Sequence, residues 1–307
     1  MIEYAPLLSP EEHEKWVNDL IIPTFTQGRT PSKNPTFILI TGQPGAGKSY
    51  SSHRYAQDHL EQTPVLFGAD DIRALHPQAE KIMRTDRTNY PFITKKDSGL
   101  ARAKLLDYCF QHGYNIVVES ILSSREDYKM PTLLQAREQG YRVECAALAV
   151  HHSVSEVSIF WRQEKQLAIT KEIGFPPTLE IHDQVYSWLP HILANMNDYQ
   201  TVDKLSIYTR SYQCYYDSDV DPKDPIYIKQ RMKEGRNSYL NLEDMSDIAI
   251  KWQEVLRMME TRGAPQKEID NVRELSAKFM KNSGLTMSSE FRNYSALLNQ
   301  IKRGSRD

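Results

Sequence analysis

The chain has 307 residues, of which 40% are hydrophobic and 25% are charged. This composition predicts a soluble globular protein with one large domain and an accessory part. The formal net charge of −2 provides no global positive field, so we expect no nucleic-acid partner. Because no apolar run has the length of a signal core or a membrane span, we expect a cytoplasmic protein without a membrane partner. Export by a route that leaves no cleaved signal stays open.

Residues 1–34 predict a helical arm. Ser9 stands as an N-cap before a proline and two acids that favour a helix start. Trp16, Leu20 and Ile21 give this helix an apolar side, and a proline-rich stretch then ends it. We expect the arm to pack on the outside of the core domain.

A buried strand that leads into a phosphate-binding loop dominates the sequence. The apolar run 37–40 is followed at once by the pattern Gly-x-x-x-x-Gly-Lys-Ser. The residues of this loop are Gly42, Gln43, Pro44, Gly45, Ala46, Gly47, Lys48 and Ser49. Glycines let backbone N–H groups face phosphate oxygens, Lys48 supplies a charge to the outer phosphates, and the Ser49 hydroxyl can ligate Mg²⁺. The alternative is a plain glycine-rich turn, but the preceding strand and the following helix favour binding of ATP or GTP.

Acidic residues follow two further predicted strands. Asp70 and Asp71 come just after the strand at 65–67, and Glu119 ends the strand at 114–120. In a parallel sheet, ligands bind beyond the carboxyl ends of the strands, so we expect these acids to lie at the same edge of the sheet as the phosphate loop. Helix capping is the equally weighted alternative for the aspartates, and a Mg²⁺ or water ligand is the alternative for Glu119.

Strands and helices alternate along the rest of the chain. We expect residues 78–97 to be polar and irregular, either lining a substrate cleft or forming a solvated loop. Further helices are predicted over 48–60, 100–112, 131–139, 153–170 and up to about 199, and further strands over 143–150, 205–208 and 213–216. The fold class is therefore α/β, a P-loop NTPase-type parallel sheet flanked by helices, with a helical C-terminal extension.

Three parts of the chain are predicted from this pattern. They are an arm over 1–34, a nucleotide-binding P-loop core over 35–216 and a helical extension over 217–307. An acidic, proline-containing stretch marks the second boundary, and helices are expected near 244–261, 266–282 and 288–303. The extension has no assigned role: covering the site, binding a partner and stabilising the fold all stay open.

Four segments taken together resemble the zeta toxins of bacterial toxin–antitoxin systems. They read G-Q-P-G-A-G-K-S, D-D-I-R-A-L-H-P, G-Y-N-I-V-V-E, and A-L-A-V with an arginine twelve residues on, within a region covering residues 5–216. The resemblance implies a kinase that transfers the γ-phosphate of a nucleoside triphosphate to the 3′-hydroxyl of the amino sugar in UDP-N-acetylglucosamine. It also implies a small helical antitoxin as a partner.

The resemblance also implies roles for individual residues. Asp70 matches the catalytic base, and Lys48 and Arg162, the latter in the lid helix, match residues that neutralise phosphate charge. Glu119 matches the substrate-binding glutamate, and Arg73 is assigned to substrate binding as well. Asp71, next to the base, is expected to support the turn.

Departures from the family pattern leave the phosphate acceptor open. Ile121 replaces a family threonine, and Ser123 stands where the family has a substrate-binding arginine unless Arg125 takes that role. The position of the family's second lid arginine falls on or near Phe175, and Lys171 is the candidate substitute. A dinucleotide is therefore the alternative acceptor, and a nucleotide-binding module without catalysis is the alternative class.

Overall fold

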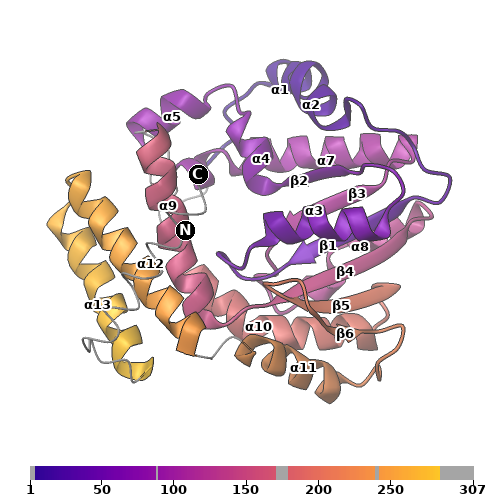
Figure 1. Cartoon of the computed structure of the whole chain (residues 1–307). Coiled ribbons are helices and arrows are strands. Elements are labelled where there is room, and N and C mark those ends of the chain that lie inside the picture. Colours follow the sequence, from indigo (N-terminus) through magenta and orange to yellow (C-terminus); the bar gives the residue numbers. More distant parts are fainter. Residues whose placement is uncertain (1–3, 88, 171–178, 239–241, 284–307) are drawn as a thin grey trace, which may run out of the picture. The chain divides into compact units, whose positions relative to one another are not determined.

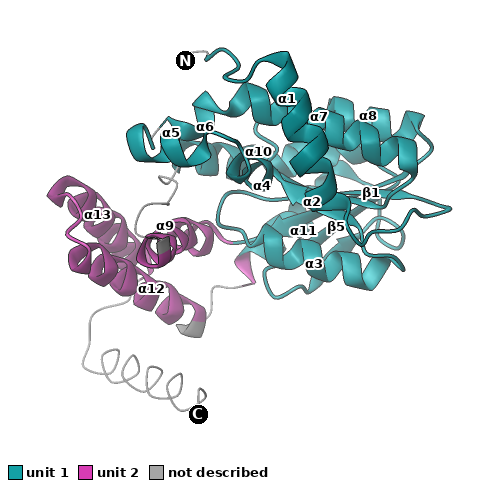
Figure 2. Ribbon diagram, turned by 90° about the horizontal axis from the view of Figure 1, so that it is seen from above, with its two compact units in different colours: residues 1–150, 178–236 teal, residues 151–177, 237–307 magenta. Residues whose placement is uncertain are grey.

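The computed structural model describes residues 4–87, 89–170, 179–238 and 242–283. The chain divides into two compact units (Figure 2). One comprises residues 1–150 and 178–236, and the other comprises residues 151–177 and 237–307. The expected boundaries at 34/35 and 216/217 stay predictions.

A six-stranded sheet forms the centre of the first unit (Figure 1). Its strands are β1 (Thr36–Thr41), β2 (Val65–Gly68), β3 (Ile116–Ser120), β4 (Arg142–Ala149), β5 (Lys204–Thr209) and β6 (Cys214–Asp217). The spatial order is β2-β3-β1-β4-β5-β6, and only β6 runs antiparallel to its neighbour. This mostly parallel sheet flanked by helices confirms the predicted fold class.

Helices cover both faces of the sheet. They are α1 (Pro10–Trp16), the π-helix η1 (Val17–Ile21), α2 (Ile22–Thr26), α3 (Lys48–His59), α4 (Ala69–Ala74), α5 (Ala79–Thr85), α6 (Tyr90–Ile93), α7 (Lys95–His112), the 3₁₀ turn η2 (Asp127–Lys129), α8 (Pro131–Glu138), α10 (Leu179–Asp198) and α11 (Pro225–Asn237). The main core joins Phe37 and Leu39 of β1 to apolar side chains of α7, α8 and α10. Since both faces of β1 are buried, the strand reads as a continuous apolar run, as is usual for parallel sheets.

The N-terminal arm contributes to this main core. Trp16, Val17 and Ile21 are buried in it, whereas Leu20 is 41% exposed. The expectation that Leu20 lies on the apolar side was wrong because residues 17–21 form a π-helix. Its wider turn brings residues five apart, Trp16 and Ile21, onto one face and leaves Leu20 outside.

The segment 78–97 is helical, which corrects the expectation of an irregular loop. It comprises α5, α6 and the start of α7. Buried Ile82, Met83 and Tyr90 anchor these short helices, so tertiary packing outweighs their polar composition.

Helix α11 was not predicted. Asp224 caps it, because its Oδ1 accepts the N–H groups of Ile226 and Tyr227 at 2.8 Å. Ile228 and Met232, four residues apart, are buried in the main core. This cap and this spacing were the sequence signals for the helix.

The second unit contains the helices α9 (His152–Thr170), α12 (Leu242–Thr261) and α13 (Gln266–Ser283). Buried Trp252 packs against Phe160 of α9, with ring centroids 5.5 Å apart. Arg262 donates two hydrogen bonds, of 2.7 and 2.9 Å, to the buried carboxylate of Glu164. The C-terminal helices therefore pack on the helix that carries Arg162.

One expected helix, near 288–303, falls outside the described residues. Among the helices that the structure describes, none is long and apolar enough to cross a membrane.

Candidate functional site

The phosphate loop leaves β1 in a conformation that its glycines make accessible. Gly45 and Gly47 have φ angles of 77° and 95°, in the region that favours glycine. A Cβ on Gly42 would lie only 3.2 Å from the Cβ atoms of Ala46 and Leu148. Glycine is therefore favoured by the turn at Gly45 and Gly47 and by the close approach to β4 at Gly42.

Gln43 ties the loop to the neighbouring strand end. Its side chain is fully buried, and Nε2 donates to the carbonyl of Val150 at 2.9 Å. A buried hydrogen bond of this kind fixes the loop relative to the end of β4. The loop is thus preorganised by the fold and does not depend on its own turn alone.

Lys48 places a positive charge within the loop. Its Nζ donates to the carbonyls of Gly42 at 3.0 Å and Gln43 at 3.3 Å. Helix α3 also begins at Lys48, so the helix dipole adds partial positive charge at the same point. This arrangement suits a bound phosphate.

Ser49 and Glu119 are in direct contact. The Ser49 hydroxyl donates to Glu119 Oε2 at 3.0 Å, and the Ser52 hydroxyl donates to Glu119 Oε1 at 2.7 Å. A hydroxyl and a carboxylate side by side are hard oxygen donors, the type that Mg²⁺ prefers. Ser49 and Glu119 therefore fit a Mg²⁺ ion chemically.

The sheet register sets the position of Glu119. In β3 it stands opposite Ile40 of β1 on one side and Gly68 of β2 on the other. A Cβ on Gly68 would lie 3.4 Å from the Cβ of Glu119, so the two strands approach closely here. The ends of β1, β2 and β3 consequently form one continuous edge.

Helix α4 carries Asp70 at this edge. Asp70 forms an ion pair with Arg73, whose side chain is only 14% exposed, while that of Asp70 is 59% exposed. Asp71 Oδ2 accepts the N–H of Gly68 at 2.7 Å, so it caps the helix as expected. The two adjacent acids thus have different surroundings, one open and paired with arginine and one engaged in capping.

Side chains from other elements hold the C-terminal end of α4. The Tyr90 hydroxyl donates to the carbonyl of Arg73, and the Trp16 indole N–H donates to the carbonyl of Leu75 at 2.8 Å. Helix carbonyls at this end have no intrahelical partner, so these donors satisfy them. The N-terminal arm is therefore linked directly to the helix that carries Asp70.

A buried His76–Asp97 pair continues this link. His76 Nε2 lies 3.3 Å from Asp97 Oδ2, and the backbone N–H of Gln78 donates to His76 Nδ1, which leaves the proton on Nε2. His13 of the arm contacts the carbonyl of Asp97 at 3.0 Å. Burial lowers the pKa of His76, while the nearby Asp97 carboxylate opposes that shift.

Arg125 lies away from these contacts. Its guanidinium stands 5.4 Å from the ring centroid of Trp188 in α10. The same region of α10 binds the loop after β3, because Gln184 Nε2 donates to the carbonyl of Ser123 at 2.6 Å. Within the part of the chain that the structure describes, Arg125 contacts α10 and not the strand edge.

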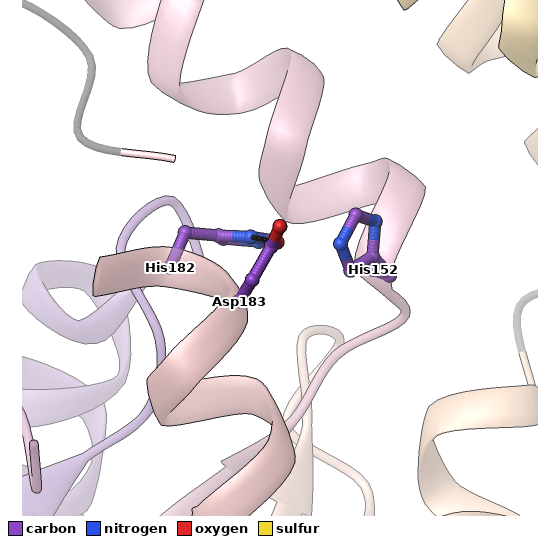
Figure 3. Close-up of side chains that lie close together, drawn as sticks. All are labelled: His152, His182 and Asp183. Carbon is purple, nitrogen blue, oxygen red and sulfur yellow. Dashed lines mark hydrogen bonds and ion pairs between the residues drawn. The ribbon is translucent and has the colours of Figure 1, made fainter. Parts of the chain in front are cut away.

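The start of α10 carries an ionisable pair beside this loop. His182 Nδ1 lies 2.8 Å from Asp183 Oδ1 (Figure 3). His182 is fully buried, while the Asp183 side chain is 61% exposed. The contact joins neighbouring residues, so it fixes the imidazole locally.

Arg162 is an exposed residue of α9 in the second unit. Its role as a lid arginine stays a prediction. Lys171 and Phe175, the positions considered for a second lid residue, lie outside the described residues.

One residue beside the loop was missed. Arg210, in the turn between β5 and β6, has its Nη1 3.4 Å from the carbonyl oxygen of Gly45. The available signal was an arginine directly after the last parallel strand. The contact could not be predicted from the sequence because Arg210 and Gly45 are 165 residues apart along the chain.

Comparison with known proteins supplies a family. A family profile described as Zeta toxin matches residues 23–221. Toxin PezT of Streptococcus pneumoniae is 26% identical over 220 residues, covering 72% of this chain and 86% of PezT. Toxin zeta of Streptococcus pyogenes is 21% identical over 221 residues, covering 70% of this chain and 76% of that protein.

A solved structure has the same fold. It comes from a study of the PezAT chromosomal toxin–antitoxin system of Streptococcus pneumoniae. The TM-score is 0.70 at 24% identity, and the match covers 82% of this chain and 99% of that one.

Proposed function

The chain belongs to the zeta toxin family, and from this membership we propose that it is an ATP- or GTP-dependent kinase of a small molecule that acts as a toxin. The observation that carries the proposal is that the phosphate loop, Glu119 and Asp70 lie at the ends of three adjacent strands, β1, β3 and β2. A donor phosphate, a metal and an acceptor hydroxyl need to meet in this way for phosphoryl transfer.

The loop is proposed to hold the donor. Backbone N–H groups between Gly42 and Ser49 would bind the phosphates, and Lys48 would move from the loop carbonyls to the outer phosphates. Ser49 would hold Mg²⁺, with Glu119 beside it, and a bound Mg²⁺ supplies charge neutralisation to the phosphates. Arg162 is proposed to add positive charge during transfer.

Asp70 is proposed as the general base. The acceptor hydroxyl attacks the γ-phosphorus, its proton passes to the Asp70 carboxylate, and the bond between the γ-phosphorus and the bridging oxygen breaks to release the nucleoside diphosphate. Arg73 pairs with Asp70 and keeps its carboxylate oriented. The exposure of Asp70 leaves room for an acceptor, which supports this assignment over a purely capping role.

Glu119 is proposed to position the acceptor. Ser49 and Ser52 hold one oxygen each, and a carboxylate oxygen can accept from two donors. Glu119 can therefore accept a further hydrogen bond from a sugar hydroxyl. Its contact with Ser49 equally supports a part in binding Mg²⁺.

A nucleotide sugar such as UDP-N-acetylglucosamine is the proposed acceptor, on the strength of the family. Arg73 is proposed to contact it, and Arg125 would have to turn away from Trp188 of α10 to do so as well. Ile121, directly after β3, stands where the family has a threonine, so a dinucleotide is kept as the second candidate acceptor. A non-catalytic nucleotide-binding module is disfavoured because Lys48, Asp70 and Glu119 are all present.

A small helical antitoxin is the proposed partner. One relative is named Toxin PezT, and the solved structure with this fold comes from a characterisation of the PezAT toxin–antitoxin system. A cytoplasmic site of action is proposed with it.

One experiment tests both donor and acceptor. The protein is incubated with γ-labelled ATP or GTP, Mg²⁺ and a panel of nucleotide sugars, dinucleotides and oligonucleotides, and any product that gains a phosphate is identified by mass. We expect label on a nucleotide sugar, with a dinucleotide as the second candidate, and no label when Lys48→Ala replaces the wild type. Transfer to no member of the panel, together with unchanged growth inhibition by Lys48→Ala, would contradict the kinase proposal.

A further inference from the structure

The strand order separates the site into two sides. Glu119 near the end of β3 and Asp70 after β2 belong to strands on one side of β1, whereas β4, β5 and β6 lie on the other. Because β1, β4 and β5 are parallel, the turn after β5 reaches the same edge as the phosphate loop. Whatever this turn presents therefore approaches the loop from the side opposite the proposed acceptor residues.

Arg210 is the residue that this turn presents to the loop. Its Nη1 lies 3.4 Å from the Gly45 carbonyl oxygen, and a Cβ on Gly47 would lie 3.9 Å from its Cγ and Nε. The side chain is half-buried, so its charge is only partly screened by water. Arg210 thus adds a guanidinium to the positive charge of Lys48 and the start of α3.

Two backbone hydrogen bonds close the turn that holds Arg210. Thr209 N–H donates to the Gln213 carbonyl at 2.9 Å, and Tyr212 N–H donates back to the Thr209 carbonyl at 3.0 Å. Tyr212 has a φ angle of 66°, a left-handed conformation that is unfavourable for a non-glycine residue. Such a conformation persists where surrounding contacts determine it.

An aromatic stack supplies those contacts. The Tyr212 ring stacks on Tyr208, with centroids 4.6 Å apart, and Tyr208 meets Tyr55 of α3 edge-on at 5.8 Å. The turn is therefore fixed against the helix that begins at the phosphate loop. The backbone that carries Arg210 is thus positioned before any ligand arrives, which reduces the entropy lost on binding.

We propose that Arg210 is a nucleotide-binding residue whose guanidinium contacts the diphosphate of the bound nucleotide. This inference rests on the proposed kinase function. Guanidinium groups bind phosphate oxygens through charge-assisted hydrogen bonds. Since Arg210 stands on the β4–β5 side of the loop, its contribution goes to the nucleotide and not to the acceptor.

The test compares ADP binding by the wild type, Arg210→Ala, Arg210→Lys and Arg54→Ala, in Mg²⁺, by calorimetry. Arg54 is the matched control, because its guanidinium lies near the Tyr212 ring of the same turn and pairs with Asp58. We expect Arg210→Ala to raise the ADP Kd about ten- to a hundredfold, as removal of charged hydrogen bonds does. Arg210→Lys should recover part of this loss, and Arg54→Ala should match the wild type.

Two further readouts separate binding from structure. The thermal midpoint without nucleotide and the KM for the phosphate acceptor should stay unchanged in Arg210→Ala. An ADP Kd within threefold of the wild type, or an equal rise in the acceptor KM, overturns the inference while leaving the kinase proposal intact. Failure of the wild type to bind ADP or GDP overturns the proposed function, and the inference with it.

Discussion

The hydroxyl of Ser49 and the carboxylate of Glu119 meet at 3.0 Å, so the phosphate loop and the end of β3 are one hydrogen-bonded unit. The loop hydroxyl that suits a metal is thereby linked to an acid 70 residues further along the chain. Ser52, one helical turn after Ser49, holds the other carboxylate oxygen. The carboxylate is therefore fixed at both oxygens.

The first prediction concerns this unit. Glu119→Gln removes the negative charge but keeps the shape, so the rate of phosphoryl transfer should fall at least about a hundredfold. Ser52→Ala removes one hydrogen bond to the same group and should cost about tenfold or less. Steady-state kinetics with the identified acceptor measures both, and a larger loss in Ser52→Ala than in Glu119→Gln would show that the charge is not what matters.

The second prediction separates the adjacent acids of α4. Asp70→Asn should reduce transfer by about 10²–10⁴-fold, as loss of a general base does, with ADP affinity within twofold of the wild type. Asp71→Ala is its control: it should cost about 1 kcal/mol of stability through the lost cap and retain most activity. Turnover that survives Asp70→Asn would remove this residue as the base.

The third prediction concerns the arm. Trp16→Phe leaves the Leu75 carbonyl without the indole donor, which should lower the free energy of unfolding by about 1–3 kcal/mol. Leu20→Ser, on the exposed side of the π-helix, should change it by no more than about 0.5 kcal/mol. Urea denaturation measures both, and a larger cost at Leu20 would contradict the observed orientation of the arm.

The fourth prediction is a pH dependence of stability. Burial lowers the pKa of His76 in the folded state, so below the ordinary pKa near 6.5 the unfolded chain binds more protons than the folded one. The contribution of neutral His76 is therefore complete above about pH 6.5 and decreases as the pH falls, by at most about 1.4 kcal/mol per pH unit. Urea unfolding between pH 5 and 7.5 should show this slope, and His76→Gln should reduce it. The exposed control His112→Gln should keep the wild-type slope of unfolding free energy against pH. If His76→Gln has the same slope as this control, the pH dependence does not come from His76.

The fifth prediction concerns the C-terminal helices. Trp252→Ala should destabilise the second unit by about 3–5 kcal/mol, because it leaves a cavity against Phe160 of α9. The exposed neighbour Arg257→Ala should have an effect of at most about 0.5 kcal/mol. Hydrogen exchange in α9, followed by mass spectrometry, localises the change. Protection of α9 that is unaffected by Trp252→Ala would mean that α12 does not stabilise it.

The sequence was most informative where local chemistry and strand ends coincide. Gly42 to Ser49 combine a fixed spacing with an apolar strand, and Glu119 ends a strand, so both could be placed without a structure. The contact between Ser49 and Glu119 also follows from parallel strands sharing one edge.

Features that depend on distant packing could not be predicted in this way. Leu20 is exposed because of a π-helix, which ordinary helical periodicity does not reveal. Helices α5 and α6 depend on a few buried side chains within a polar segment. Arg210 approaches Gly45 only through the order of β1, β4 and β5, which a list of motifs does not contain.

The register of β2 on β3 has a consequence for how acceptor specificity could evolve. Gly68 and Glu119 face each other, so the chain segments that follow them, α4 and residues 120–125, leave the sheet as neighbours. Under the roles proposed above, acceptor choice is encoded in these two short segments. Replacing these two segments could change the acceptor while leaving the phosphate loop and the nucleotide site unchanged. The same change could be engineered by grafting both segments from a relative with a different acceptor.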